Sequence, residues 1–128
     1  GAIGYAEVSY ARNGSLGVAK IANGSGHFVE PSAGAVTAAL TSAVVAPDGT
    51  VALDLDPKDP AAYPISTVTY AVVPRNPKAS DRAALLAAFA SYAVGDGQRV
   101  AERLAYAPLP ERLVEAARAA IPGPGGAR

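Results

Sequence analysis

Hydrophobic and polar residues follow different patterns in the two halves of this chain. Up to about residue 65, short apolar runs are separated by Gly, Asn, Asp and Pro. From about residue 79, alanine-rich stretches carry larger apolar residues three or four positions apart. Short runs between turn residues are typical of short strands, whereas a spacing of three or four is typical of helices. The pattern therefore predicts an α/β chain whose second half is helical.

The strongest strand signal is the run from Ile65 to Val73, which lies between Pro64 and Pro74. This run is dense in β-branched and aromatic residues, which are enriched in strands, and prolines commonly bound strands. Apolar residues occur at both odd and even positions of the run, so both faces are expected to be buried. Burial on both faces is typical of the interior of an α/β sheet. We therefore predict one central strand here.

Weaker signals predict the elements that precede this strand. Residues 3–5 form a short apolar run, which we interpret as a buried strand, and residues 7–12 are expected to form a short helix. The Asn-Gly pair within residues 23–26 separates two apolar runs and predicts a β-hairpin. Residues 32–43 have helical spacing and start with a serine suited to an N-cap. A further turn is predicted at residues 48–49.

Two helices are predicted directly after the central strand. Ser80 is placed to cap the first of them, in which Leu85, Phe89 and Tyr92 recur on one face. We interpret these three residues as a buried stripe. A shorter second helix is expected around residues 100–104, where apolar residues lie four positions apart.

The third helix is predicted from Pro110, a residue suited to the first turn, to Pro122. Its apolar face is expected to contain Leu113, Val114, Ala117, Ala120 and Ile121. Its water-facing side is expected to contain Arg112, Glu115 and Arg118. Residues 122–128 read as a tail or the start of a linker.

Length, charge and composition narrow the class of protein. A chain of 128 residues is long enough for one domain with a modest core. Eleven basic and eleven acidic residues give no net charge, which argues against a nucleic-acid partner. The absence of cysteine excludes disulfides and Cys-ligated zinc, and the single histidine excludes a multi-histidine metal site. No apolar run reaches the length of a membrane helix, and the opening Gly1-Ala2-Ile3 does not resemble a signal peptide.

Three features carry candidate chemistry, and each has a simpler interpretation. The glycines of Asn23-Gly24-Ser25-Gly26 suit an anion-binding loop, but a strand-like run follows them, so a hairpin turn is favoured. His27 is interpreted as a strand residue because no nucleophile motif surrounds it. Asp54, Asp56 and Asp59 could suggest a calcium loop, but the pattern lacks the glycine of an EF-hand at its sixth place and has Ile65, not Glu, at its twelfth, which favours a solvated acidic loop. No catalytic, ligand-binding or metal residue is therefore assigned, no cofactor is expected, and an enzyme is not predicted.

Four segments in register resemble one protein family. They are Gly1-Ala2-Ile3-Gly4-Tyr5, then Tyr63-Pro64-Ile65-Ser66 running into Thr67-Val68-Thr69-Tyr70, then Gly95-Asp96-Gly97-Gln98, then Tyr106-Ala107-Pro108-Leu109-Pro110. Their order and spacing are similar to the carboxy-terminal part of the phosphate-binding protein of bacterial phosphate ABC transporters. The resemblance implies a periplasmic-binding-protein-like (type II) fold with two lobes, of which only the carboxy-terminal portion is present. It also implies an extracytoplasmic location, periplasmic or cell-surface.

By this resemblance, residues 1–64 would complete the second lobe of the family fold. Residues 65–128 would supply the return strand and three helices that pack on the first lobe, with residues 122–128 as the tail. The family's phosphate-contacting loops precede the segment that matches Gly1, so no residue of this chain inherits a ligand role. Phosphate binding is therefore expected only when upstream ligand loops are supplied, and the chain is expected to be part of a longer protein.

Two functions remain open at this stage. One is a part of a solute-binding protein that delivers phosphate to the membrane subunits of a transporter. The other is a structural or interaction module of the same fold that does not bind phosphate. In both cases an uncovered central strand predicts association, either of the chain with itself or with a missing amino-terminal part.

Overall fold

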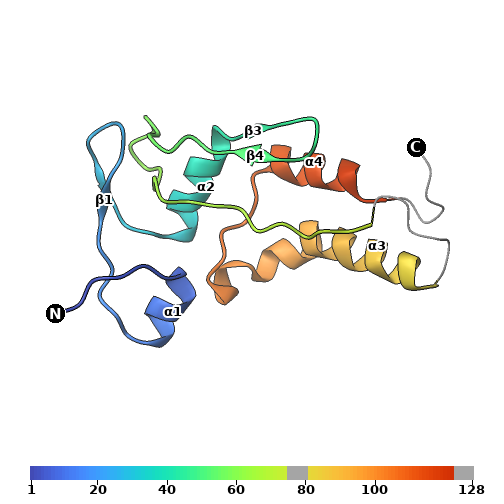
Figure 1. Cartoon of the computed structure of the whole chain (residues 1–128), viewed down its shortest axis with the longest axis horizontal. Helices are drawn as coiled ribbons and strands as arrows, with labels where there is room; N and C mark the ends of the chain where they lie inside the picture. Colours follow the sequence, from blue (N-terminus) through green and yellow to red (C-terminus); the bar gives the residue numbers. More distant parts are fainter. Residues whose placement is uncertain (75–80, 123–128) are drawn as a thin grey trace.

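A computed structural model of the chain describes residues 1–74 and 81–122 (Figure 1). The helices in these ranges are α1 (Val8–Asn13), α2 (Ala33–Thr41), α3 (Asp81–Val94) and α4 (Glu111–Ala120), with 3-10 helices η1 (Asp96–Val100) and η2 (Glu102–Leu104). The strands are β1 (Ile21–Ala22), β2 (Phe28–Val29), β3 (Val44–Val45) and β4 (Val51–Ala52). None of the helices within the described ranges combines the length and apolarity needed to cross a membrane.

The four strands form two separate antiparallel hairpins. In the first, Ile21 lies opposite Val29, so the hairpin predicted around residues 23–26 is confirmed. In the second, Val45 lies opposite Val51 across the predicted turn. Gly49 adopts a φ of +88° in this turn, a conformation that glycine takes without strain. The described residues therefore form an α/β chain, but the sheets are small and the predicted central sheet is not among them.

The turn between β3 and β4 is held by a side chain as well as by the backbone. The backbone N–H of Thr50 donates a hydrogen bond to a carboxylate oxygen of Asp48 over 2.9 Å. Hydrogen bonds from Thr50 lower the pKa of Asp48 below its ordinary value of 3.8, because they stabilise the charged carboxylate.

Most of the elements that local sequence patterns predict in the first half are confirmed. Helix α1 overlaps the predicted range of residues 7–12 and is shifted by one residue, and the Ser32 hydroxyl accepts a hydrogen bond from the backbone N–H of Ala35 at the start of α2. The strand predicted at residues 3–5 is wrong. Ile3 and Tyr5 are fully exposed, and no strand is assigned there, because no neighbouring segment is present for these residues to pair with.

The core lies between α2 and α4, and it is small. The buried apolar residues of the described ranges are Ala35, Ala39, Leu40, Ala43, Ala62, Leu113 and Val114. Two contacts between distant segments hold this pair of helices together. The Thr37 hydroxyl donates to the carbonyl oxygen of Pro108 over 3.0 Å, and the Arg112 guanidinium donates to the carbonyl oxygens of Thr41 and Ala43.

Helix α4 follows the predicted pattern with two differences. Leu113 and Val114 are buried, and Glu115 and Arg118 are exposed, as expected. Ala120, expected on the apolar face, is exposed near the end of the helix. Pro110 occupies the N-cap position and not the first helical turn. The predicted tail lies outside the described residues beyond Pro122.

The central strand predicted from Ile65 to Val73 is wrong for this chain as it stands. Residues 65–74 run through the molecule without secondary structure, beside hairpin β3–β4 and then over α3 (Figure 1). Ile65 is 69% exposed, Tyr70 is 53% exposed and Val72 is 96% exposed. The propensity of the sequence is that of a strand, but a strand needs a neighbouring strand whose backbone groups it can bond.

The buried stripe predicted on the first helix of the second half is also wrong. In α3, Leu85, Phe89 and Tyr92 are 71%, 63% and 56% exposed. The opposite side of the helix, which includes Leu86 and Ala90, faces the rest of the molecule instead. The spacing identified one apolar face correctly but did not say which side has a neighbour to pack against. The predicted cap at Ser80 lies outside the described residues.

The shorter second helix predicted around residues 100–104 is replaced by two 3-10 turns. η1 follows α3 after Gly95, and η2 ends at Leu104 and is followed by Ala105, which has a φ of +63°. This left-handed residue lets the chain reverse direction toward α4.

Candidate functional site

The Asn23-Gly24-Ser25-Gly26 loop directs its hydrogen-bond donors inward. The side-chain oxygen of Asn23 accepts hydrogen bonds from the backbone N–H of Ser25 over 3.1 Å and from the backbone N–H of His27 over 3.2 Å. An anion-binding loop needs such N–H groups to be free to point at the ligand. The side chain of Asn23 already accepts two of these N–H groups, so they do not point at a ligand. The loop is therefore the hairpin turn that the sequence favours.

Asn23 is also the joint between this hairpin and the acidic loop. It is 6% exposed, and its amide donates to the carbonyl oxygens of Asp59 over 2.9 Å and of Ala62 over 3.1 Å. On the exposed side, the Lys58 ammonium group donates to the carbonyl oxygen of Gly24 over 3.0 Å. The two segments are therefore held together by a network that satisfies both ends of the Asn23 side chain.

The three aspartates of the acidic loop bond their own segment. Asp54 and Asp59 each accept a hydrogen bond from the backbone N–H two residues later, and Asp56 pairs with Lys58 over 2.8 Å. Aspartate commonly forms such local turns. Within residues 1–74 and 81–122, no group of three or more acidic or histidine side chains is arranged to hold a metal ion.

His27 lies on the exposed side of the first hairpin. Its Nδ1 atom is 2.9 Å from the hydroxyl oxygen of Ser25. Neighbouring hairpin residues account for this contact, and the described residues place no acidic side chain against the ring. A catalytic histidine needs a partner that orients it, so the geometry favours the structural interpretation.

A polar hollow lies at the carboxyl end of α3. Its lining includes Tyr92, Asp96 and Arg99, and Arg118 approaches it from α4. Asp96 and Arg99 pair with each other over 2.9 Å, and both side chains are more than two-thirds exposed. The end of a helix carries the negative pole of its dipole, which disfavours anions. This exposed pair and one arginine do not make a binding site for phosphate.

Tyr63, Gln98 and Leu109, which belong to the motifs of the family resemblance, make hydrogen bonds between separate segments. The side-chain amide of Gln98 donates to the carbonyl of Ala93 in α3 over 2.6 Å and accepts from the backbone N–H of Leu109 over 2.9 Å. The backbone N–H of Tyr63 donates to the carbonyl of Ala35 in α2 over 3.0 Å. In both cases a residue of a resemblance motif joins a helix to a neighbouring loop segment.

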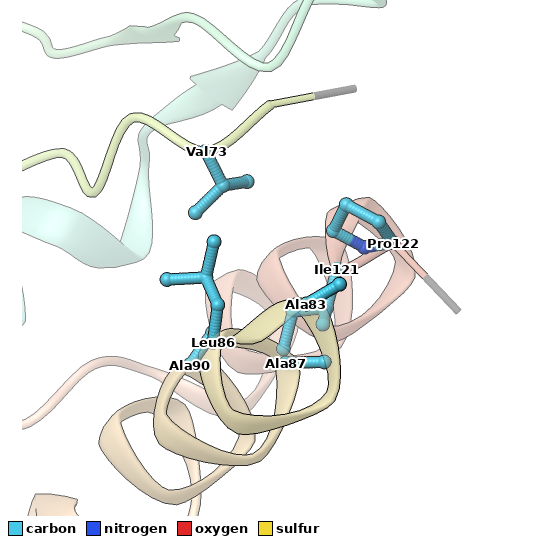
Figure 2. Close-up of a pocket in the computed structure, with 7 residues that line it drawn as sticks. All are labelled: Val73, Ala83, Leu86, Ala87, Ala90, Ile121 and Pro122. Carbon is cyan, nitrogen blue, oxygen red and sulfur yellow. The ribbon is translucent and has the colours of Figure 1, made fainter. Parts of the chain in front are cut away.

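An apolar hollow lies between the end of residues 65–74 and helices α3 and α4. Figure 2 shows Val73 pointing toward Leu86 of α3, with Ile121 and Pro122 at one side. The space between these side chains is hardly larger than a water molecule, so it is a packing contact and not a ligand cavity. It fixes the end of the extended segment against α3.

Most of the large apolar residues lie outside the core. Sixteen of them are exposed in the described ranges, whereas the buried apolar residues are four alanines, two leucines and one valine. Exposed apolar surface of this extent is typical of an interaction surface. Two parts of this exposed apolar surface each come from a single segment of the chain. One is the extended segment, residues 65–74, and the other is the outward face of α3, with Leu85, Phe89 and Tyr92. These two parts are the candidate functional surface of this chain.

The sequence identified both parts but placed them in the core. No local signal separates a strand that has neighbours in the same chain from one that lacks them. Two observations indicate a missing neighbour: the small number of other strand signals available to flank residues 65–74, and the family resemblance, which implies that only the carboxy-terminal portion of the fold is present.

Comparisons with known proteins identify the family. A family model described as "PBP superfamily domain" matches residues 1–97. The chain is 32% identical over 121 residues to the phosphate-binding protein PstS of Xylella fastidiosa (strain Temecula1 / ATCC 700964), a match that covers 90% of this chain and 32% of that protein. It is 26% identical over 114 residues to the phosphate-binding protein PstS of Pasteurella multocida (strain Pm70), covering 88% of this chain and 33% of that protein.

This chain therefore spans about a third of the length of the curated relatives it matches. No solved structure matches it significantly.

Proposed function

Because this chain belongs to the PBP superfamily, we propose that it is part of an extracytoplasmic solute-binding protein that captures inorganic phosphate for an ABC transporter. The observation that carries the proposal is the match to two phosphate-binding proteins over 88% and 90% of the chain. The membrane subunits of the transporter are the partners of the intact protein under this proposal. The role is one of binding and delivery, not of catalysis.

Within that protein, this chain supplies structure and not ligand contacts. Residues 1–64 complete the second lobe, and residues 65–128 supply the return strand and the helices that pack on the first lobe. The Asn23 loop and the Asp96–Arg99 pair support this role, because the Asn23 side chain already accepts the N–H groups of Ser25 and His27 and Asp96 already pairs with Arg99. The phosphate-binding loops lie in the remainder of the protein.

A second candidate function is an interaction module of the same fold that does not bind phosphate. The observation in its favour is the same filled loop, because no built anion site is present in the described residues. The two candidates differ in one property. A part of a phosphate-binding protein restores binding when the remaining two-thirds of the fold is supplied, and an interaction module does not.

A chimera tests this difference. The whole chain replaces the matched segment of the Xylella fastidiosa phosphate-binding protein, and calorimetry measures phosphate binding to the chimera, to the chain alone and to the unaltered relative. We expect micromolar or tighter binding by the chimera, about −8 kcal/mol, and none of this strength by the chain alone. Sulfate serves as the control anion.

Two results would contradict the proposal. A chimera that unfolds cooperatively but does not bind phosphate would favour the interaction module. Micromolar binding by the chain alone would show that its own residues form a phosphate site.

A further inference from the structure

We propose that Asn13 is a site of spontaneous chemical modification, at which the side-chain amide is converted to an acid, and that the fold protects Asn23 from the same reaction. The tripeptide Asn-Gly-Ser occurs at residues 13–15 and again at residues 23–25. Because the two copies have the same local sequence, a difference in their reactivity comes from their surroundings. This inference does not depend on the proposed function.

The reaction is an intramolecular attack on the asparagine side chain. The backbone nitrogen of the next residue loses its proton to hydroxide and bonds to the side-chain carbonyl carbon, Cγ. The bond from Cγ to the amide nitrogen then breaks, and ammonia leaves with a proton taken from water. Water opens the five-membered ring that results, which gives aspartate or its isomer isoaspartate. Glycine at the next position favours ring closure, because it has no side chain to obstruct the attack and its backbone turns freely.

The side chain of Asn13 is not restrained within the described part of the chain. It is exposed at the last position of α1, and its amide makes no hydrogen bond to another described residue. The attacking nitrogen belongs to Gly14, whose backbone N–H donates to the carbonyl oxygen of Tyr10 over 2.9 Å. This hydrogen bond at the end of the helix must therefore open before the reaction starts.

The structure of α1 favours that opening. The helix has six residues, none of them buried, and no side chain caps its first turn. Helices this short are marginal in water unless tertiary contacts support them. Ser15, directly after Gly14, has a φ of +52°, in the left-handed region that disfavours residues with a side chain. Opening the turn therefore relieves strain and frees the nitrogen of Gly14 for attack.

The second copy is held at the atoms that the reaction must move. The Asn23 amide is bonded at both ends, because its oxygen accepts from two backbone N–H groups and its nitrogen donates to two backbone carbonyl oxygens. Asn23 is 6% exposed, so water has little access to the nitrogen that must leave. Gly24 packs closely against Asp56, which limits the movement of the attacking nitrogen. The joint must therefore open before Asn23 can react.

The consequences of conversion also differ between the two positions. At Asn13 it adds one negative charge to a chain with no net charge, at the negative pole of the α1 dipole, so the helix is weakened. The chain should stay folded, because α1 has no buried residue. At Asn23 the new carboxylate would face the carbonyl oxygens of Asp59 and Ala62, which would repel it. Protection of Asn23 therefore preserves the joint.

Peptide mapping of the whole chain during incubation in mildly alkaline buffer tests the contrast. Trypsin cleavage after Arg12, Lys20 and Lys58 places the two asparagines in separate peptides, residues 13–20 and 21–58, and mass spectrometry measures the conversion of each. In the folded chain, residues 13–20 should convert at least about 10-fold faster, since a group held in stable structure reacts only when that structure opens. In urea the two peptides should convert at similar rates.

Asn13→Gln is the matched control. Glutamine keeps the amide and the charge, but its reaction requires a six-membered ring, which closes far more slowly. The variant should keep the melting temperature of the chain, because residue 13 is exposed. It should also lose most of the acidic species that isoelectric focusing resolves in the incubated parent chain.

Three results would overturn the inference. Equal or faster conversion of residues 21–58 in the folded chain would show that the fold does not protect Asn23. Conversion of residues 13–20 in urea but not in the folded chain would show that α1 protects Asn13. An acidic species that forms at an unchanged rate in Asn13→Gln would place the modification at another residue.

Discussion

The side-chain amide of Asn23 donates a hydrogen bond to the carbonyl oxygen of Ala62, 39 residues further along the chain, over 3.1 Å. Both residues are buried, although the strands on either side of Asn23 are only two residues long. A hairpin of that length is marginal on its own. Asn23 therefore stabilises the hairpin by joining it to the segment that leads into residues 65–74.

Replacing Asn23 with alanine should destabilise the chain by at least about 2 kcal/mol. The substitution leaves the carbonyl of Ala62 and the N–H of Ser25 without their partner, and unsatisfied buried polar groups are costly. Thermal or urea unfolding measures the change. Ser25→Ala is the control, since it removes only hydroxyl contacts on the exposed side and should cost less than about 1 kcal/mol. Equal losses in the two variants would contradict the role given to Asn23.

Gly24→Ala should destabilise the contact between the first hairpin and the acidic loop for a steric reason. A Cβ atom at this position would overlap the backbone carbonyl oxygen and the carboxylate of Asp56, so the acidic loop would have to move. We expect a loss of about 1–3 kcal/mol, as for other overpacked sites. Gly34→Ala in α2 has open space around it and should stabilise the chain by about 0.5–1 kcal/mol. Chemical denaturation of both variants should therefore give changes of opposite sign.

Leu113→Ala should cost about 2–5 kcal/mol because Leu113 is only 4% exposed on the buried side of α4. Glu115→Ala, on the exposed side of the same helix, should change stability by less than about 0.5 kcal/mol. The melting temperatures of these two variants test the orientation of α4. Arg112 is not a suitable surface control, although its spacing predicts a water-facing residue, because its guanidinium bonds two carbonyl groups near the end of α2.

In α3, the smaller of two apolar residues should matter more for the stability of the isolated chain. Leu86→Ala should lower stability, because Leu86 contacts the end of the extended segment in the apolar hollow. Phe89→Ala should have little effect, since Phe89 is 63% exposed. Circular dichroism during heating compares the two directly. A larger loss from Phe89→Ala would mean that the apolar stripe is buried after all.

The elements that the sequence predicts correctly are those fixed by nearby residues. The Asn-Gly turn, the Ser32 cap and the face of α4 that includes Leu113 each depend on contacts or spacing within a few positions. The errors at Ile65 to Val73 and at the α3 stripe have a different origin. Both segments have the propensity expected of them, but their burial depends on neighbours that residues 1–74 and 81–122 do not provide. Such long-range context is not encoded in local pattern.

The bonds from Thr37 to Pro108 and from Arg112 to Ala43 also bear on the order of folding during synthesis. They join residues 71 and 69 positions apart, so α2 gains these partners only after α4 has left the ribosome. Until then, α2 lacks these later partners, and the nascent chain exposes apolar surface for the time taken to add about 70 residues. Closing so long a loop is also slow compared with forming a local hairpin. We therefore expect a chaperone that binds nascent apolar segments to act on this chain between the synthesis of α2 and that of α4.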